Sequence, residues 1–236
     1  MKVFLGYDPR EAEAFAVARS SITRQTPGVD VRALHLPTLR ERGYYKRPTS
    51  RRDGQLWDDI SDAPMSTEFA ISRFLTKELA GSGWAVFMDC DVLVRMDLRF
   101  LLVSAESQYA VMCVKHKHEP IEATKMDGQL QTLYARKNWS SVMLFNCDHP
   151  ANRALTVEMI NTLPGRDLHR FCWLRDEEIG ALYMGWNHLV GTSNPDIEPH
   201  LVHFTAGGPW LPGYEDVPFA DEWRAERARW LNKEAA

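Results

Sequence analysis

The pattern of apolar and polar residues at the start of the chain predicts a strand, a helix and a second strand. Residues 3–5 form a short buried-strand pattern that ends at the turn-forming residues 6–9. Residues 10–24 carry apolar side chains at helical spacing, and residues 29–36 alternate well enough for a second strand. The order strand, helix, strand opens a βαβ unit and favours a parallel sheet.

The rest of the chain continues to alternate between strands and helices. Further strands are predicted at 84–88, 92–94, 109–114, 141–145 and 201–204, and further helices at 66–80, 151–163, 176–183 and 220–231. Residues 38–63 lack a clear period and are rich in Arg, Asp, Gly and Tyr, so we interpret them as a long surface excursion that is mobile without ligand. The pattern contains no repeat or linker and predicts one α/β domain over residues 1–236.

The composition narrows the class of protein. The 236 residues, 44% hydrophobic and 25% charged, suffice for one large domain with a substantial core. A formal net charge of −4 does not favour nucleic acid as a partner, so an anionic ligand would need a local site. The apolar start is too short for a signal peptide, and no stretch approaches the length of a transmembrane segment. We therefore expect a cytoplasmic protein.

Two carboxylates lie between two apolar strand patterns, where burying them unpaired would be unfavourable. Asp89 and Asp91 follow residues 84–88 and precede residues 92–94. Side chains two residues apart in an extended chain project to the same side, so both can converge on one Mg²⁺ or Mn²⁺ ion. The alternative is a strand-end turn with two solvated aspartates. The flanking apolar runs favour the metal.

The remaining cysteines and histidines form no such pattern. The cysteines lie far apart without a CxxC pair, at Cys90, Cys113, Cys147 and Cys172. Their apolar neighbours predict buried free thiols in a reducing compartment. His116 and His118 lie in a Lys-His-Lys-His run, which we interpret as a solvated basic segment rather than a ligand pair.

Six segments carry chemistry-bearing residues in an order that spans nearly the whole chain. They are residues 6–8, 69–74, 87–93, 140–146, 176–178 and 201–205. Together they resemble the GT-A fold glycosyltransferases, and most closely the retaining glycosyltransferase family 8 (the glycogenin and galactosyltransferase group). The resemblance implies a Rossmann-like α/β fold whose mixed, mostly parallel central sheet is flanked by helices. It also implies hexose transfer from a UDP-sugar to a glycan or other hydroxyl acceptor, with retention of configuration and with Mn²⁺ or Mg²⁺ as cofactor.

The resemblance assigns donor-binding roles to residues in several of these segments. The residues that it places against the nucleotide sugar are Gly6, Tyr7, Asp8, Arg73, Asp89, Cys90 and Asn146. Gly207 and Gly208 allow positive φ, so their amides could cradle phosphate oxygens; a simple turn before Pro209 is the alternative. Arg73 lies on an otherwise apolar helix face, so its charge needs a partner. A donor phosphate or sugar hydroxyl is favoured, and a structural salt bridge is the close alternative.

Metal-binding and catalytic roles follow from the same resemblance. His203 alone would be interpreted as a core histidine, but the glycine turn after it and the resemblance favour a third metal ligand beside Asp89 and Asp91. Imidazole suits Mn²⁺ better than Mg²⁺. Asp176 and Glu177 are placed beside the donor sugar, where a carboxylate would stabilise an oxocarbenium-like transition state and Arg73 would assist. Acids at a helix start are also common for purely structural reasons.

The chain departs from the family's pattern at two positions. The lysine that commonly follows the histidine is absent from residues 207–210, and Glu177 stands where the family has glutamine. Donor specificity therefore does not carry over.

Two other functions stay open. A nucleotidyltransferase is disfavoured because residues 6–10 hold a single glycine. A non-catalytic sugar- or nucleotide-binding module would leave the three candidate metal ligands unexplained.

Overall fold

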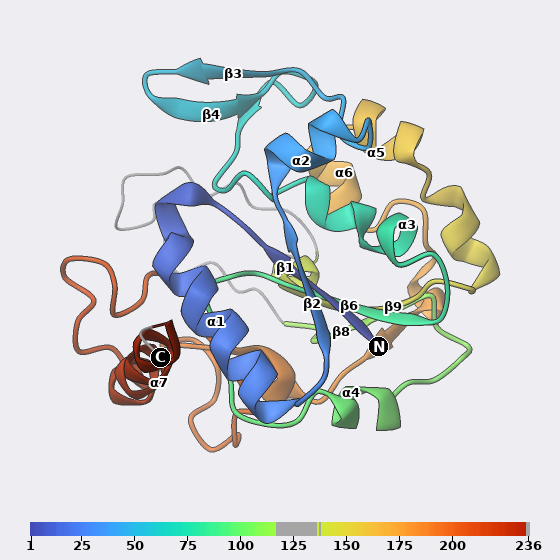
Figure 1. Cartoon of the computed structure of the whole chain (residues 1–236). Helices are drawn as coiled ribbons and strands as arrows, with labels where there is room; N and C mark the ends of the chain where they lie inside the picture. The colour runs from blue at the N-terminus through green and yellow to red at the C-terminus, as the bar shows by residue number, and fades with distance from the viewer. Residues whose placement is uncertain (117–135, 137, 235–236) are drawn as a thin grey trace.

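A computed structural model describes residues 1–116, 136 and 138–234 and shows a central sheet flanked by helices (Figure 1). Within these residues the sheet has six strands in the order β10-β8-β9-β6-β1-β2. The strands are β1 (Lys2–Gly6), β2 (Asp30–Leu34), β6 (Trp84–Met88), β8 (Val111–Cys113), β9 (Val142–Asn146) and β10 (Ile179–Ala181). Three neighbouring pairs are parallel, and β9 is antiparallel to both of its neighbours. The predicted α/β class with a mixed, mostly parallel sheet is confirmed.

Two smaller sheets and a set of short helices complete the described residues. The small sheets are β11-β12-β7, from β7 (Val92–Val94), β11 (His188–Leu189) and β12 (Leu201–His203), and β3-β4-β5, from β3 (Thr49–Arg52), β4 (Gln55–Asp58) and β5 (Ala63–Pro64). The α-helices are α1 (Ala12–Gln25), α2 (Leu36–Glu41), α3 (Thr76–Ala80), α4 (Arg99–Val103), α5 (Val157–Thr162), α6 (Gly165–His169) and α7 (Ala220–Glu234). The 3₁₀ helices are η1 (Pro9–Glu11), η2 (Ser72–Leu75), η3 (Trp139–Ser141), η4 (Pro150–Ala154), η5 (Asp176–Glu178) and η6 (Met184–Asn187).

The direction of the strands decides where a ligand can bind. Every strand of the central sheet except β9 runs the same way, so the carboxyl ends of five strands meet at one edge. In open α/β sheets this edge is where ligands bind. β6 lies between β9 and β1, and its residues from Ala85 to Met88 are fully buried, as expected of a strand covered on both faces. The chain leaves β6 directly into Asp89, which places that carboxylate at the ligand-binding edge.

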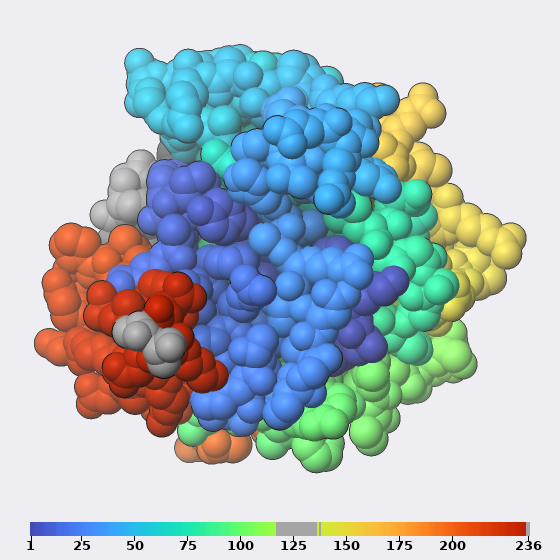
Figure 2. Space-filling model, in the orientation of Figure 1, coloured from blue at the N-terminus to red at the C-terminus, as the bar shows by residue number. Residues whose placement is uncertain are grey.

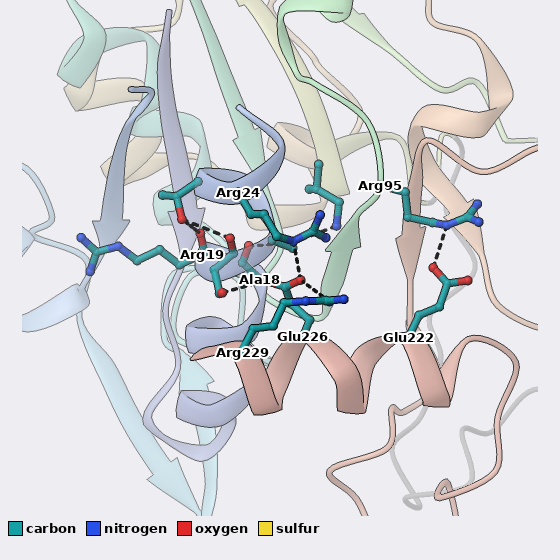
Figure 3. A network of polar contacts seen from close by, with 11 residues as sticks. Ala18, Arg19, Arg24, Arg95, Glu222, Glu226 and Arg229 are labelled. Atoms are coloured by element: carbon teal, nitrogen blue, oxygen red, sulfur yellow. Dashed lines mark hydrogen bonds and ion pairs between the residues drawn. The ribbon is translucent and has the colours of Figure 1, made fainter. Parts of the chain in front are cut away.

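A buried carboxylate on α7, the last helix, accepts hydrogen bonds from α1, the first α-helix. α7 packs along α1 (Figure 2). Glu226 of α7 is fully buried and accepts hydrogen bonds from Ser20 Oγ at 2.7 Å and Arg24 Nε at 2.7 Å (Figure 3). Arg229, one turn further along α7, donates to the same carboxylate at 3.2 Å. A buried charge with this many donors is compensated, so α7 closes the fold against α1.

Residues 38–63, predicted to be a long surface excursion that is mobile without ligand, contain regular secondary structure, and their mobility stays a prediction. They contain the end of α2 and the three strands of a small antiparallel sheet that projects from one end of the molecule (Figure 2). The fully buried Arg47 anchors this small sheet to the rest of the protein. It forms an ion pair with Asp58 of β4 and donates to the carbonyl oxygens of Ile160 and Leu163 at 2.8 and 2.7 Å. This long-range anchor leaves no periodic signal in the sequence.

Three predicted helices differ from the structure. Residues 66–80 become helical only from Ser72, as η2 and α3, and residues 151–163 divide into η4 and α5. The predicted helix at 176–183 is wrong: η5 is followed by β10, because Ile179 is buried beside Val111 at the end of the sheet. Pairing with β8 therefore outweighs the helix-start signal of three consecutive acids.

Two expectations from composition can also be compared with the structure. Among the described residues, no helix combines the length and the apolar character that a membrane span requires. The cysteines are all free, but only Cys90 and Cys113 are buried; Cys147 is partly exposed and Cys172 is exposed. The expectation of four buried thiols is therefore wrong for two of them.

Candidate metal and donor site

A cavity of about 460 Å³ lies at the carboxyl ends of β1 and β6. Arg10 and Glu11, which follow β1, line it together with Asp89 and Asp91, which follow β6. The remaining lining comes from residues 66–73, from residues 138–141 before β9, from His169 of α6, and from the end of β12 with the segment after it. The cavity therefore gathers segments from across the whole chain at the edge where the strand directions predict a ligand.

Two aspartates and a histidine meet in this cavity. One ligand atom from each of Asp89, Asp91 and His203 lies within 4.8 Å of the other two. The register of β7 and β12 produces this arrangement, because His203 pairs with Val92 and so lies beside Asp91. The Phe204 amide donates to the Asp91 carbonyl oxygen at 2.9 Å, which fixes the two loops together. The three residues that the sequence predicted as metal ligands are thus brought together.

The chemistry of this cluster fits a divalent cation. Two carboxylates and an imidazole are a donor set that suits Mn²⁺, and each is only partly exposed or buried. Glu11 adds a third carboxylate to the cavity lining. Burial, reinforced by the charge of Asp91, raises the pKa of Glu11 to about 7. The cavity therefore concentrates negative charge in a partly buried place, which a cation would relieve.

Arg73 holds one of the aspartates in place. Its Nη1 lies 2.9 Å from Asp89 Oδ1 and also donates to the Ser140 carbonyl oxygen at 2.9 Å. The guanidinium carbon lies 5.0 Å from the centroid of the Phe87 ring and 5.5 Å from that of Phe69. The side chain is only 7% exposed. Between a donor phosphate and a structural salt bridge, the structure supports the salt bridge, although Arg73 does line the cavity.

The comparisons with known proteins agree with this architecture. A relative from Arabidopsis thaliana, Protein CDI, is 45% identical over 240 residues, which cover 99% of this chain and 88% of that protein. The chain belongs to the CDI family. No protein-family model matches it.

Solved structures similar to this CDI-family chain are glycosyltransferases. The bifunctional glycosyltransferase WbbM has a TM-score of 0.64 at 16% identity; the match covers 97% of this chain and 49% of that one, so this chain spans about half of WbbM. The galactosyltransferase LgtC, solved with donor and acceptor sugar analogues, has a TM-score of 0.59 at 13% identity over 97% of this chain and 96% of that one. GlyE of Streptococcus pneumoniae TIGR4 has a TM-score of 0.62 at 12% identity over 98% of this chain and 63% of that one. These likenesses establish the GT-A fold.

Residues 6–8, which the resemblance places against the nucleotide sugar, have structural roles in this CDI-family chain. Gly6 allows close approach of Phe69, whose ring a Cβ at this position would meet at 2.5 Å. Tyr7 packs edge-on against Phe15, with ring centroids 5.1 Å apart. Asp8 is buried and accepts from the Arg10 and Glu68 amides at 2.9 and 3.0 Å. Gly6, Tyr7 and Asp8 do not line the cavity, so their predicted donor contacts are not supported; the two residues that follow Pro9 line it instead.

Two other residues predicted to bind the donor are not among the cavity-lining residues. Cys90 is fully buried, and its thiol donates to Glu11 Oε2 at 3.2 Å. Asn146 ends β9 and pairs with Trp84 at the beginning of β6, so it lies at the opposite end of the sheet from Asp89. The antiparallel direction of β9 explains this error, because it brings the beginning of that strand, not its end, to the site. The structure thus places Asn146 far from the cavity, while the donor-binding role of Cys90, which lies between two lining residues, stays a prediction.

The predicted catalytic acids Asp176 and Glu177 are also outside the cavity. They precede β10, which runs parallel to β6, whereas Asp89 follows the end of β6. Their side chains are 86% and 64% exposed and form ion pairs with Arg136 and Arg175. The described residues therefore do not bring these acids to the cavity lining, and their catalytic role stays a prediction.

This placement gives a testable expectation for the two acids. Asp176→Asn and Glu177→Gln are expected to leave both kcat and the KM for donor within about twofold of wild type, because neither carboxylate reaches the cavity. Steady-state kinetics on both variants measures this. A fall in kcat of more than about tenfold in either variant would support the predicted role of that carboxylate in the chemical step.

Of the two glycines in the turn after β12, only Gly207 is among the cavity-lining residues. Gly207 lines the cavity and has a φ of +143°, a conformation that L side chains rarely adopt. Gly208 does not line the cavity; a Cβ there would overlap the Trp210 ring. Gly207 thus stays a candidate for backbone contact with phosphate oxygens, while Gly208 serves the packing of Trp210.

The sequence interpretation missed several residues of the site. Ser140 and Ser141 line the cavity because they precede β9, and the Ser141 carbonyl oxygen accepts from the Asp89 amide at 3.0 Å. His169 lines it too; burial and the neighbouring Arg73 lower its pKa to about 3. The sequence did contain a signal for Glu11, because this residue lies at the start of the first predicted helix, directly after the turn that follows β1. The others depend on strand direction and on loop packing. Of the histidines first interpreted as solvated, His116 is partly buried and His118 lies outside the described residues.

A second cavity of about 370 Å³ lies among α1, β7 and α7. Its arginines already form ion pairs: Arg24 and Arg229 pair with Glu226, and Arg95 pairs with Glu222 (Figure 3). Arg95 also pairs with Glu198. Because these charges are compensated within the protein, we assign no ligand to this cavity.

Proposed function

We propose that this CDI-family protein is a metal-dependent glycosyltransferase that moves a hexose from a UDP-sugar to a glycan or other hydroxyl acceptor. The observation that carries the proposal is the cluster of Asp89, Asp91 and His203 in a cavity at the carboxyl edge of a GT-A sheet. A donor set of this kind, at the place where open α/β sheets bind nucleotides, suits a cation that bridges protein carboxylates and a diphosphate.

The three residues of the cluster would hold the cation, with Mn²⁺ favoured over Mg²⁺ because one ligand is an imidazole. When bound, a divalent cation supplies Lewis-acid stabilisation of a departing diphosphate. Arg73 keeps Asp89 oriented toward the cavity through its 2.9 Å ion pair. The conformation of Gly207 exposes backbone in the cavity lining without a side chain to block a ligand.

The choice of donor, the retention of configuration and the single-domain organisation are each supported by a different observation. The UDP-sugar and the retention of configuration come from the resemblance of the sequence segments to retaining GT-A enzymes. LgtC, whose structure holds donor and acceptor sugar analogues, has the same fold. We also propose that residues 1–236 form a single domain. α1 and β7 support this, because both contribute buried residues to the larger and to the smaller hydrophobic cluster.

The assay that tests the proposal is release of UDP from UDP-glucose and UDP-galactose. With Mn²⁺ we expect release above the background of the donor alone, and with EDTA in place of the metal we expect none. Binding of a UDP-sugar without release in the presence of a broad set of sugar acceptors would favour the non-catalytic binding module instead. The absence of both binding and release would contradict the proposal.

A further inference from the structure

Asn187 lies behind His203, and its amide connects segments that carry the candidate metal ligands. It is fully buried at the end of η6. Its Oδ1 lies 2.8 Å from His203 Nδ1. Its Nδ2 lies 2.9 Å from Ser141 Oγ and 3.3 Å from the Asn138 carbonyl oxygen. A buried polar side chain with partners on both of its amide atoms is held in one orientation.

The partners of Asn187 decide which way its amide points. A carbonyl oxygen only accepts, so the group that faces the Asn138 carbonyl must be the NH₂. The amide oxygen then faces His203 and only accepts, which places a proton on Nδ1 of the imidazole. Nε2 then faces Asp91, whose two carboxylate oxygens are each 3.2 Å away, so it is the nitrogen left to bind a cation.

We propose that Asn187 is a positioning residue that keeps the proton of His203 on Nδ1 and aims Nε2 at a divalent cation. The proposal rests on the metal site proposed above. A positive charge belongs between Nε2 and the carboxylate oxygens 3.2 Å away; a second proton on the imidazole supplies it in the metal-free protein, and a bound cation would displace that proton and supply it instead. The 3.2 Å separation brings the imidazole and the carboxylate close enough for both to hold one divalent cation.

Asn187 also connects His203 to the segment that supports Asp89. Ser141, which receives the Nδ2 hydrogen bond, accepts from the Asp89 amide through its carbonyl oxygen at 3.0 Å. Its hydroxyl donates to the Asn138 carbonyl at 2.7 Å. One amide therefore links the histidine of β12 with the loop beside β6. Hydrogen bonds to metal-bound imidazoles have this role in general, and their loss weakens metal binding by about 10–100-fold.

The test is Mn²⁺ binding to the full chain, measured by calorimetry with the metal alone. Asn187→Leu fills similar space but cannot accept from Nδ1, and we expect its Mn²⁺ affinity to fall by about 10–100-fold. Asn187→Asp keeps an acceptor for Nδ1–H but loses both donor contacts, so we expect affinity within about threefold of wild type and a lower thermal midpoint. In Asn187→Asp the thermal midpoint should therefore fall while the Mn²⁺ affinity stays near that of wild type. A purely structural role for Asn187 would not separate these two quantities.

Asn152→Leu is the matched control, because Asn152 is equally buried and hydrogen-bonded through both of its amide atoms but does not line the cavity. We expect it to bind Mn²⁺ within about threefold of wild type. Asn187→Ala makes the same comparison as Asn187→Leu if the latter does not fold. Unchanged affinity in a folded Asn187→Leu or Asn187→Ala would overturn the positioning role while the metal site stands. Failure of the wild-type chain to bind Mn²⁺ would overturn the metal site itself, and the positioning role with it.

Discussion

Replacing Asp91 by asparagine is expected to abolish Mn²⁺-dependent UDP binding while the fold stays intact. The substitution removes one of two carboxylates from the cluster, and an amide oxygen is a weaker ligand for a hard cation than a carboxylate. Since the loss of an outer-shell hydrogen bond already weakens metal binding by about 10–100-fold, the loss of a ligand should exceed about 100-fold. Calorimetric titration of UDP in the presence of Mn²⁺ measures the change.

Stability provides the first check on this result. The variant removes a negative charge from a cavity that also holds Glu11 and Asp89, so the thermal midpoint of the metal-free protein should not fall. Asp196→Asn is a suitable control, because this aspartate is exposed and does not line the cavity. Tight Mn²⁺-dependent UDP binding by Asp91→Asn would show that the cation is held elsewhere.

Replacing Arg47 by methionine is expected to lower the free energy of unfolding by about 3–5 kcal/mol. Arg47 is fully buried, so its removal leaves the Asp58 carboxylate without its cation and the carbonyl oxygens of Ile160 and Leu163 without their donor. Urea unfolding measures the loss. Arg52→Met is the matched control: its ion pairs with Asp59 and Asp62 are exposed, and such pairs contribute about 0–1 kcal/mol.

The same ion pair predicts a dependence on pH. Burial alone would raise the pKa of Asp58, but the hydrogen bonds from Arg47 and Ser61 outweigh it and lower the pKa below its ordinary value of 3.8. A lowered folded-state pKa means stability that is present above pH 3.8 and lost as the pH falls through the folded-state value. The difference between wild type and Arg47→Met should therefore shrink in acid below pH 3.8. Equal differences at pH 7 and pH 2.5 would contradict this account.

Local sequence patterns predicted the parts of the site that depend on one strand and its immediate neighbours. Asp89 and Asp91 were found because a long apolar run and a carboxylate pair share one short segment. The assembly of His203 beside them follows from β7–β12 pairing, which the sequence suggested only through a family resemblance. In β6, β7 and β12, therefore, the position expected from the sequence is also the position found in the fold.

The errors come from strand direction and from long-range anchors. Asn146 was placed at the site by the family resemblance, but the end of a strand meets the site only if the strand is parallel to β6, and β9 is antiparallel. Asp176 was assigned to a helix because acids favour a helix start, but the residues after it pair with β8. Asn187 was missed because a buried asparagine behind a histidine gives no periodic signal. Its importance comes only from partners that lie 16 to 49 residues away.

The central claim is that Asp89, Asp91 and His203 hold a divalent cation that joins the protein to a UDP-sugar. The most direct measurement is anomalous diffraction at the manganese edge from crystals grown with Mn²⁺ and UDP. We expect one manganese peak in the cavity, in contact with a carboxylate oxygen of each aspartate and with Nε2 of His203, and with the diphosphate of UDP completing its shell. UDP bound in the cavity with no manganese peak among these three residues, or manganese bound elsewhere, would contradict the account.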